Sequence, residues 1–216
     1  MKKLIRLKII VIGQKTMTTS LLNCNIPVSS AKSQLRVYDL PAEWQQRLPT
    51  CVREIDSALD YHPPITMYGK VCHQQRSVGF FSDISKGYHY STQLSKSKPM
   101  THSLEELMHF VNGAFGCEFN GILINKYESG EEYIGRHSDD KTGLAPEVGV
   151  VLISVGTVRK FRIRNKNGQI IADVPTDPAK IIQMWGDFQK EFTHEIPVEK
   201  RVQGVRYSLT FRQHTV

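Results

Sequence analysis

The stretch YIGRHSDDKTG, residues 133–143, places three side chains that can bind a metal ion or move a proton close together: His137, Asp139 and Asp140. Residues two apart in an extended strand project from the same face, so His137 and Asp139 can hold one ion together. A third ligand is offered by His194 in FTHEIP, far enough along the chain to lie on a neighbouring strand. Two histidines and one carboxylate suit iron(II) and leave coordination positions open. The alternatives are a general acid/base pair and a polar turn that contains a histidine by chance.

A second chemically informative segment is RYSLTFR, residues 206–212. If it is a strand, one face carries Arg206, Ser208, Thr210 and Arg212. Two arginines facing the inside of a barrel are costly unless each meets an anion, and a dicarboxylate spanning the pocket would serve both. The NKY segment offers Asn125 and Tyr127, also two apart, to the same ligand. The alternative is that both arginines lie on a solvated edge strand.

The composition is that of an ordinary globular protein. The 216 residues are 40% hydrophobic and 23% charged, enough for one large domain or two small ones. No apolar run approaches the roughly 18 residues of a membrane span. The four cysteines are spread along the chain without a C-x-x-C pair, which indicates reduced thiols in an intracellular protein.

The net charge of +7 is concentrated at the N-terminal end. Residues 1–38 contain seven basic residues and no acidic one, whereas basic and acidic residues balance in the rest of the chain. We interpret 1–38 as a basic, flexible arm, with a linker rich in Ser, Thr and Asn over 13–35. Such an arm can contact polyanions, serve as an organelle transit peptide, or be a solvated leader.

The rest of the chain divides into a mixed region and a strand-rich region. Helical spacing predicts a helix within 42–60, restarting at Pro49, and a second helix that begins with a capping box of Ser103 and Glu106. Between them, HPPITMYGKVC and RSVGFFSD are predicted to be short strands, and the polar segment 82–100 a functional loop. From Phe119 onward, seven short β-rich segments are separated by turns, among them the hairpin signal NKNG at 165–168. This spacing predicts a sandwich or barrel.

The segments NKY, HSD, MWGDFQKEFTHEIP and RYSLTFR, in this order, resemble the AlkB family of Fe(II)/2-oxoglutarate dioxygenases. The likeness covers roughly residues 65–213 and is greatest to the nucleic-acid demethylases, whose two-aspartate variant reads HSDD here. The resemblance implies a mainly β fold with flanking helices, a double-stranded β-helix or jelly-roll barrel. The corresponding domain would span 39–216, with a helical and lid region over 39–118 and the barrel core over 119–213.

The resemblance also implies roles for individual residues. The iron ligands would be His137, Asp139 and His194. Arg206 and Tyr127 would hold the distal carboxylate of 2-oxoglutarate, with Arg212 and Asn125 near the carboxylate next to iron. Ser208 stands where the family has asparagine; its hydroxyl can still donate a hydrogen bond but is shorter than an amide.

For the substrate, Asp140 matches an acidic residue on the substrate side in the two-aspartate relatives, and Lys141, which follows it, leaves the base preference open. The lid residues that would clamp an extruded base are Arg76, Phe80, Phe81, Tyr88 and Tyr90. A place in the core is the competing interpretation for Phe80 and Phe81.

The function implied is oxidative demethylation of N-alkylated bases in DNA or RNA, such as N1-methyladenine or N3-methylcytosine. The reaction would use Fe(II), 2-oxoglutarate and O2 and release formaldehyde, succinate and CO2. The alternatives are a dioxygenase of the same class acting on a methylated protein or small molecule, and an inert nucleic-acid-binding module. The basic segment RKFRIRNK (159–166) favours nucleic acid. We expect a monomer without membrane contact, in the nucleus or cytoplasm unless the N-terminal arm directs it to an organelle.

Overall fold

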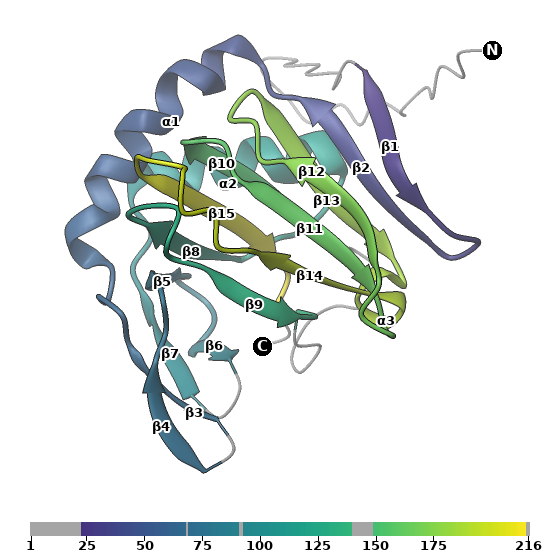
Figure 1. The fold of residues 1–216 in the computed structure, drawn as a ribbon. Helices are drawn as coiled ribbons and strands as arrows, with labels where there is room; N and C mark the ends of the chain where they lie inside the picture. Colours follow the sequence, from purple (N-terminus) through teal and green to yellow (C-terminus); the bar gives the residue numbers. More distant parts are fainter. Residues whose placement is uncertain (1–22, 68, 91–92, 140–148, 215–216) are drawn as a thin grey trace.

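Two β-sheets packed face to face form the body of the protein (Figure 1). The computed structural model describes residues 23–67, 69–90, 93–139 and 149–214. This arrangement confirms the expected mainly β fold with flanking helices. Among the described residues, no helix is long and apolar enough to cross a membrane.

The larger sheet contains nine strands. Their order is β1 (Cys24–Ser29), β2 (Ser33–Asp39), β13 (Lys180–Gly186), β10 (Val150–Gly156), β15 (Arg206–Arg212), β8 (Gly121–Tyr127), β5 (Ser77–Phe81), β7 (Gln93–Lys98) and β6 (Gly87–Tyr90). The smaller sheet has the order β12 (Ile170–Pro175), β11 (Lys160–Asn165), β14 (Phe192–Ile196) and β9 (Ile134–His137). A separate hairpin pairs β3 (Pro64–Met67) with β4 (Lys70–His73). All seven strand segments predicted after Phe119 are present.

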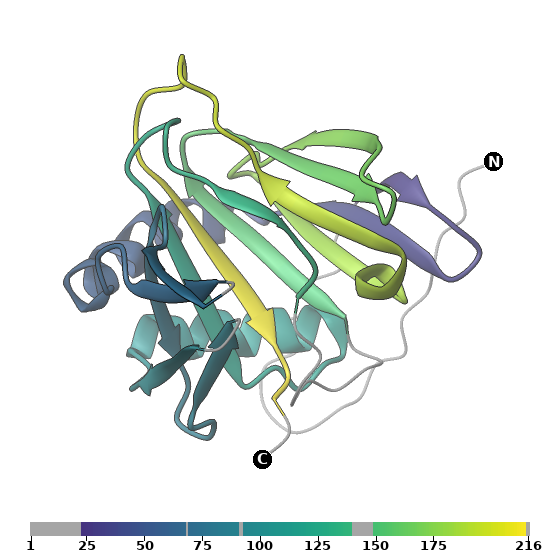
Figure 2. The ribbon, with the colours of Figure 1, turned by 60° about the horizontal axis from the view of Figure 1, so that its bottom comes forward.

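Two hydrophobic cores hold these layers together. One lies between the sheets, where Leu152 and Met184 of the larger sheet meet Phe161 and Ile163 of the smaller one. The other lies on the opposite face of the larger sheet, which is covered by α1 (Ala42–Ile55) and α2 (His102–Phe115) (Figure 2). The central strands of the larger sheet are therefore buried on both faces, which explains why β10 is apolar along almost its whole length.

The two long helices differ in detail from the sequence prediction. Helix α1 runs through Pro49 without a restart, because buried Trp44, Leu48 and Val52 on either side anchor it to the sheet and outweigh the missing backbone donor. The capping box at α2 was also wrong. Thr101 caps this helix by accepting a hydrogen bond from the Leu104 amide at 3.3 Å, whereas Ser103 donates to Glu54 of α1. A short 3-10 turn, η1 (Asp56–Ala58), follows α1.

The predicted N-terminal linker contains two strands instead. Strand β2 pairs with β13 at seven successive positions and buries Leu35 completely between the sheets. The β1–β2 hairpin lies at the sheet edge, where much of its surface meets water, and this explains the polar composition that suggested a linker. The flexible arm predicted over 1–38 is therefore wrong for residues 24–38, and residues 1–22 lie outside the described residues.

Two further predictions need correction. The segment 82–100, expected to be a loop, contains the β6–β7 hairpin, whose strand β7 runs parallel to β5. Because the segment is polar and lacks a clear apolar alternation, its composition alone gave no strand signal. The predicted boundary at 119 also fails as a structural division, since β2 and β5 from the first part complete the same sheet as β8 and β15.

Candidate metal and cosubstrate site

The three residues predicted to bind metal meet at one end of the space between the sheets. His137 ends β9, and His194 lies directly opposite it on β14, its antiparallel neighbour. Their rings are 4.3 Å apart between centroids. Asp139 follows two residues after His137, and its Oδ1 lies 4.0 Å from His137 Nε2 and 3.9 Å from His194 Nε2. One ligand atom from each residue lies within 4.8 Å of the other two, so a single ion can contact all three.

Burial and hydrogen bonding prepare the two imidazoles for a metal. His137 Nδ1 lies 2.8 Å from the carbonyl oxygen of Gly135. Because a carbonyl only accepts, Nδ1 carries the hydrogen and Nε2 keeps its lone pair toward the triad. Burial lowers the pKa of His137, and it lowers the pKa of His194 to about 3 with help from neighbouring His137. Both rings are therefore neutral near pH 7, the form that binds metal.

Asp139 is held as a carboxylate. Burial alone would raise its pKa, but Arg212 and the two histidines together lower it below the ordinary value. Arg212 Nη2 lies 2.5 Å from Oδ1, and the Gln189 amide donates to Oδ2 at 3.3 Å. Gln189 also accepts from the Asp139 backbone amide at 2.9 Å. The short helix α3 (Phe188–Glu191) thus fixes the position of this carboxylate.

The alternation predicted for β15 is confirmed. Arg206, Ser208, Thr210 and Arg212 all line the cavity that contains the triad, whereas Leu209 and Phe211 belong to the core under the helices. Asn125 and Tyr127 of β8 line the same cavity. Ser208 stands between Ser154 of β10 and Asn125 of β8 in the strand register, so the position with the unexpected serine has polar neighbours on both sides.

Arg206 is a buried cation whose partners are neutral. Its Nε donates to Thr176 Oγ1 at 3.2 Å and its Nη2 to Ser154 Oγ at 2.9 Å, and its guanidinium lies 5.3 Å from the centre of the Tyr127 ring. Burial lowers its pKa to about 10. Among the described residues, no acidic side chain forms an ion pair with it. A buried arginine in this setting is energetically suited to an anionic ligand.

Unpaired polar atoms concentrate in the same cavity. In the described part of the chain, seven buried side-chain polar atoms have no hydrogen-bond partner, and four of them belong to His194, Arg206 and Arg212. For the arginines these atoms are Arg206 Nη1 and Arg212 Nε and Nη1, all donors. Buried donors are normally satisfied, so three together indicate a site built for an acceptor.

A second cavity adjoins the first and shares Arg76, Tyr88 and Leu123 with it. Arg76 donates to Asn125 Oδ1 at 2.7 Å, which links a residue predicted to contact the substrate with one predicted to contact the cosubstrate. The Tyr88 ring lies 4.5 Å from the Arg212 guanidinium. The β7 residues Lys96 and Lys98 also line this cavity. Two of the predicted lid residues, Arg76 and Tyr88, therefore do reach the site.

The remaining predicted substrate residues are not all found at the two cavities. Phe81 is buried among the residues of the core under the helices and Phe80 in a small cluster with Val78 and Leu123, so the core interpretation holds for both and the lid role of Phe81 was wrong. Because β5 is buried on both faces, neither ring is available to a substrate. The Tyr90 side chain and Asp140 lie outside the described residues.

The basic face predicted for 159–166 is largely neutralised. Arg162 forms a bidentate ion pair with Asp173, with distances of 2.7 and 2.8 Å, and Arg164 pairs with Glu195 at 2.9 Å. Their acidic partners come from the neighbouring strands β12 and β14, which an inspection of β11 alone does not reveal.

Four residues of the site escaped the sequence prediction: Ser154, Arg159, Thr176 and Gln189. Their side chains act through partners between 17 and 52 residues away. They belong to no periodic pattern or short motif. Only the position of Arg159, directly before a strand whose second residue is buried, offered a weak signal.

Comparisons with known proteins agree with this geometry. A sequence model of the 2OG-Fe(II) oxygenase superfamily matches residues 38–212. The chain belongs to this superfamily. The human DNA oxidative demethylase ALKBH2 is 29% identical over 157 residues, covering 69% of this chain and 60% of the relative. Human alpha-ketoglutarate-dependent dioxygenase alkB homolog 3 is 28% identical over 149 residues, or 64% of this chain and 51% of the relative.

A solved structure supports the fold assignment. OsALKBH1 matches with a TM-score of 0.55 at 13% identity, over 88% of this chain and all of that one. At this identity the likeness concerns the fold. The chain spans 60% of the length of human ALKBH2.

Members of the superfamily use Fe(II), 2-oxoglutarate and O2, and the residues present fit these groups. The donor set of His137, Asp139 and His194 is the two-histidine, one-carboxylate set that suits iron(II). The unpaired donors of Arg206 and Arg212 match a ligand with two carboxylates.

Proposed function

We propose that the chain is an Fe(II)/2-oxoglutarate-dependent oxidative demethylase of N-alkylated bases in DNA or RNA. The observation that carries the proposal is one cavity that combines a metal triad with two buried arginines whose donors are unsatisfied. The relatives named as a DNA oxidative demethylase and an alkB homolog support the substrate class. Iron(II) with 2-oxoglutarate and O2, when bound, supplies the chemistry that yields succinate and CO2 and converts an N-methyl group to formaldehyde.

The side chains that surround the metal site would set its geometry. Gly135 fixes the His137 tautomer so that Nε2 faces the ion, and Arg212 with Gln189 orients Asp139. Arg206 and Tyr127 would take the distal carboxylate of 2-oxoglutarate, while Arg212 and Asn125 would lie near the carboxylate next to the metal. In this arrangement Arg212 contacts both a metal ligand and the cosubstrate, and so aligns one with the other.

The second cavity is the proposed place for the base. It shares the Tyr88 ring and the apolar Leu123 with the cavity of the metal triad, and Lys96 also lines it. An extruded base can stack on an aromatic ring while its phosphates meet a lysine. N1-methyladenine and N3-methylcytosine carry a positive ring charge, which suits a neighbouring carboxylate, the role proposed for Asp140. A monomer located in the nucleus or cytoplasm remains our prediction.

Formaldehyde release tests this proposal. Purified protein with Fe(II) and 2-oxoglutarate is incubated with methylated DNA and RNA oligonucleotides, single- and double-stranded, and with methylated peptides and methylated amines. We expect formaldehyde from at least one oligonucleotide and none when His194 is replaced by alanine. Formaldehyde from a peptide or small amine alone would support the alternative substrate class. Oligonucleotide binding without any turnover of 2-oxoglutarate would support an inert binding module.

A further inference from the structure

Arg206 is oriented by two hydroxyl groups rather than by an acid. Thr176 Oγ1 accepts from Nε and Ser154 Oγ accepts from Nη2, while Nη1 has no partner in the described structure. Because the guanidinium is planar, two fixed acceptors on Nε and Nη2 determine its plane and leave Nη1 for a ligand. Thr176 and Ser154 are 1% and 3% exposed, so water does not compete for these bonds.

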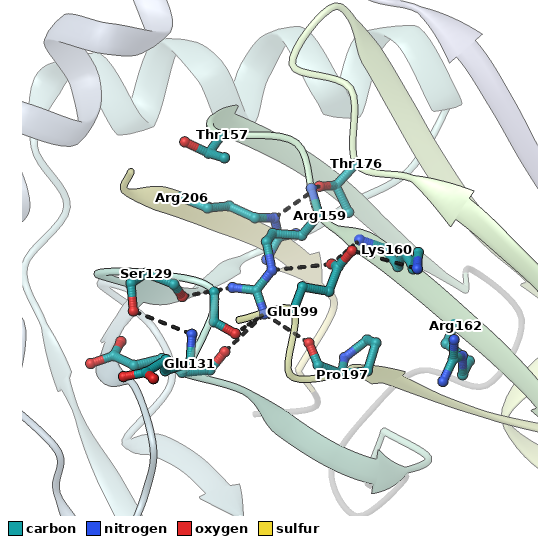
Figure 3. Close-up of polar contacts among 12 residues, drawn as sticks. Ser129, Glu131, Thr157, Arg159, Lys160, Arg162, Thr176, Pro197, Glu199 and Arg206 are labelled. Carbon is teal, nitrogen blue, oxygen red and sulfur yellow. Dashed lines mark hydrogen bonds and ion pairs between the residues drawn. The ribbon is translucent and has the colours of Figure 1, made fainter. Parts of the chain in front are cut away.

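The Thr176 hydroxyl is itself held in place by Arg159. The Arg159 backbone amide donates to Thr176 Oγ1 at 2.8 Å, and the Thr176 amide donates to the Arg159 carbonyl at 2.8 Å. The hydroxyl oxygen thus accepts from two N–H groups, one on each side (Figure 3). Its position is set by the backbone at the end of the β11–β12 pair.

The Arg159 side chain extends this support to the strands that carry the metal ligands. Its guanidinium is almost fully buried and donates to four backbone carbonyls, those of Ser129, Gly130, Glu132 and Pro197, at 2.7–3.3 Å. Figure 3 shows the bonds to Ser129 and Pro197. It also pairs with Glu199 at 3.2 Å. Residues 129–132 lead into β9 and His137, and Pro197 follows β14 and His194.

Gly130 permits this close approach of the two loops. A Cβ at this position would lie 2.1 Å from the Glu199 carbonyl oxygen, which no side chain tolerates. Hydrogen bonds from the Gly130 amide to Val202 and from the Glu199 amide to Gly130 close the contact. Arg159 therefore sits at a junction where the two metal-bearing strands and the Thr176–Arg206 pair converge.

We propose that Thr176 is the positioning residue for the cosubstrate arginine Arg206, and that Arg159 ties this position to the strands carrying His137 and His194. The inference rests on the proposed function, because it assigns Arg206 to the distal carboxylate of 2-oxoglutarate. A hydroxyl suits this task better than a carboxylate. An acid at position 176 would form a permanent ion pair with Arg206 and compete with the cosubstrate, whereas threonine orients the cation and leaves its charge for the ligand.

The test measures binding to manganese-loaded protein by calorimetry, so that no turnover is needed. Two ligands are compared: 2-oxoglutarate and 2-oxopentanoate, which has a methyl group where 2-oxoglutarate has its distal carboxylate. We expect Thr176→Val to weaken 2-oxoglutarate binding about tenfold and to leave 2-oxopentanoate binding unchanged, since only the first ligand uses Arg206. Thr176→Ser, which keeps the hydroxyl, should restore the affinity for 2-oxoglutarate.

Two controls separate positioning from a general structural effect. Thr157→Val removes a hydroxyl that bonds the Gln203 carbonyl at the same end of the sheets, without contact to Arg206, and should change neither affinity. The double variant Thr176→Val/Arg206→Gln should bind 2-oxoglutarate no more weakly than Arg206→Gln alone. If Thr176→Val fails to fold, Ser154→Ala replaces it with the same expected selectivity.

The outcomes are distinguishable. A wild-type protein that binds manganese but not 2-oxoglutarate would contradict the proposed function, and this inference with it. Wild-type binding together with an unchanged affinity in Thr176→Val would overturn the inference alone. An equal loss for both ligands would overturn it as well, because the effect would not act through the distal carboxylate.

Discussion

At the scale of single residues, Asp139 has two roles that one substitution separates. It supplies the only carboxylate of the triad, and it is the acidic partner of buried Arg212. We expect Asp139→Asn to abolish metal retention and turnover. It should also lower the free energy of unfolding of the metal-free protein by about 3–5 kcal/mol, since it leaves a buried cation uncompensated.

The control for this variant is Asp173→Asn, which makes the same change in an ion pair exposed at the surface of the smaller sheet. Exposed pairs contribute about 0–1 kcal/mol, so urea unfolding should show little change and metal content none. Equal destabilisation by both variants would show that the buried charge of Arg212 does not need Asp139 as its acidic partner.

His214 gives a residue-scale prediction for pH. Burial, with a further effect of Arg212, lowers its pKa to about 4, and its ring packs against Phe80 and Tyr88. The unfolded chain takes up a proton near pH 6.5, whereas the folded chain does so only near pH 4. Stability from this residue is therefore present above about pH 6.5 and is lost as the pH falls toward 4.

In metal-free protein, urea unfolding should show this loss directly. Between pH 7 and pH 5, the free energy of unfolding of the wild type should fall by about 2 kcal/mol more than that of His214→Gln, which has no proton to take up there. Parallel pH profiles for the two proteins would mean that His214 titrates normally in the folded state.

The residues that the sequence revealed and those that it concealed differ in a physical way. His137, Asp139, Arg206 and Arg212 could be predicted, because side chains two apart on a strand share a face and their chemistry is specific. Thr176 and Gln189 could not, because each acts through a partner that only the sheet pairing brings near. A hydroxyl or an amide in isolation has too many ordinary uses to indicate a role.

At the scale of elements, β5 and β6, two strands that follow one another in the chain, divide structural and functional roles. Phe81 of β5 packs in the core under the helices, whereas Tyr88 of β6 lines both cavities. We expect Phe81→Leu to lower the free energy of unfolding by about 1–2 kcal/mol with the KM for oligonucleotide unchanged. Tyr88→Leu should raise that KM severalfold, because a stacking surface is lost.

Steady-state kinetics and urea unfolding of the two variants check this division, and Leu123→Ala serves as a further variant on the wall between the cavities. A raised KM for oligonucleotide in Phe81→Leu would show that the Phe81 ring does contribute to the substrate site. The strand β6 was itself hidden from sequence inspection, because its four residues GYHY are too short a segment for a clear alternation, and its pairing with β7 appears only in the structure.

At the scale of the whole molecule, the site exists only because two sheets face each other. The smaller sheet supplies His137 and His194, and the larger one supplies Asn125, Tyr127, Arg206 and Arg212. The sequence predicted the strands and their inward faces, since both follow from a period of two. It did not predict which strands from the first part of the chain complete the larger sheet, because backbone pairing over long separations leaves little trace in composition.

The N-terminal strands lead to a prediction about truncation. Removing residues 1–22 leaves every described element intact, whereas removing 1–38 deletes β1 and nearly all of β2. The second deletion exposes an edge of β13 and takes Leu35 out of the core that contains Ile182 and Met184. We therefore expect the shorter deletion to preserve the thermal midpoint and 2-oxoglutarate turnover, and the longer one to lower both.

The shorter deletion also isolates the effect of charge, because residues 1–22 contain five basic residues and no acidic one. If these residues contact phosphates, binding of an oligonucleotide duplex should lose up to about 0.9 in the slope of log K against log salt for each contact removed. Titrations of the full chain and the shorter deletion at several salt concentrations measure this difference. An identical slope would show that residues 1–22 do not contact the duplex, and nucleic-acid affinity would then rest on the folded domain, with Lys96 beside the second cavity the first residue to test.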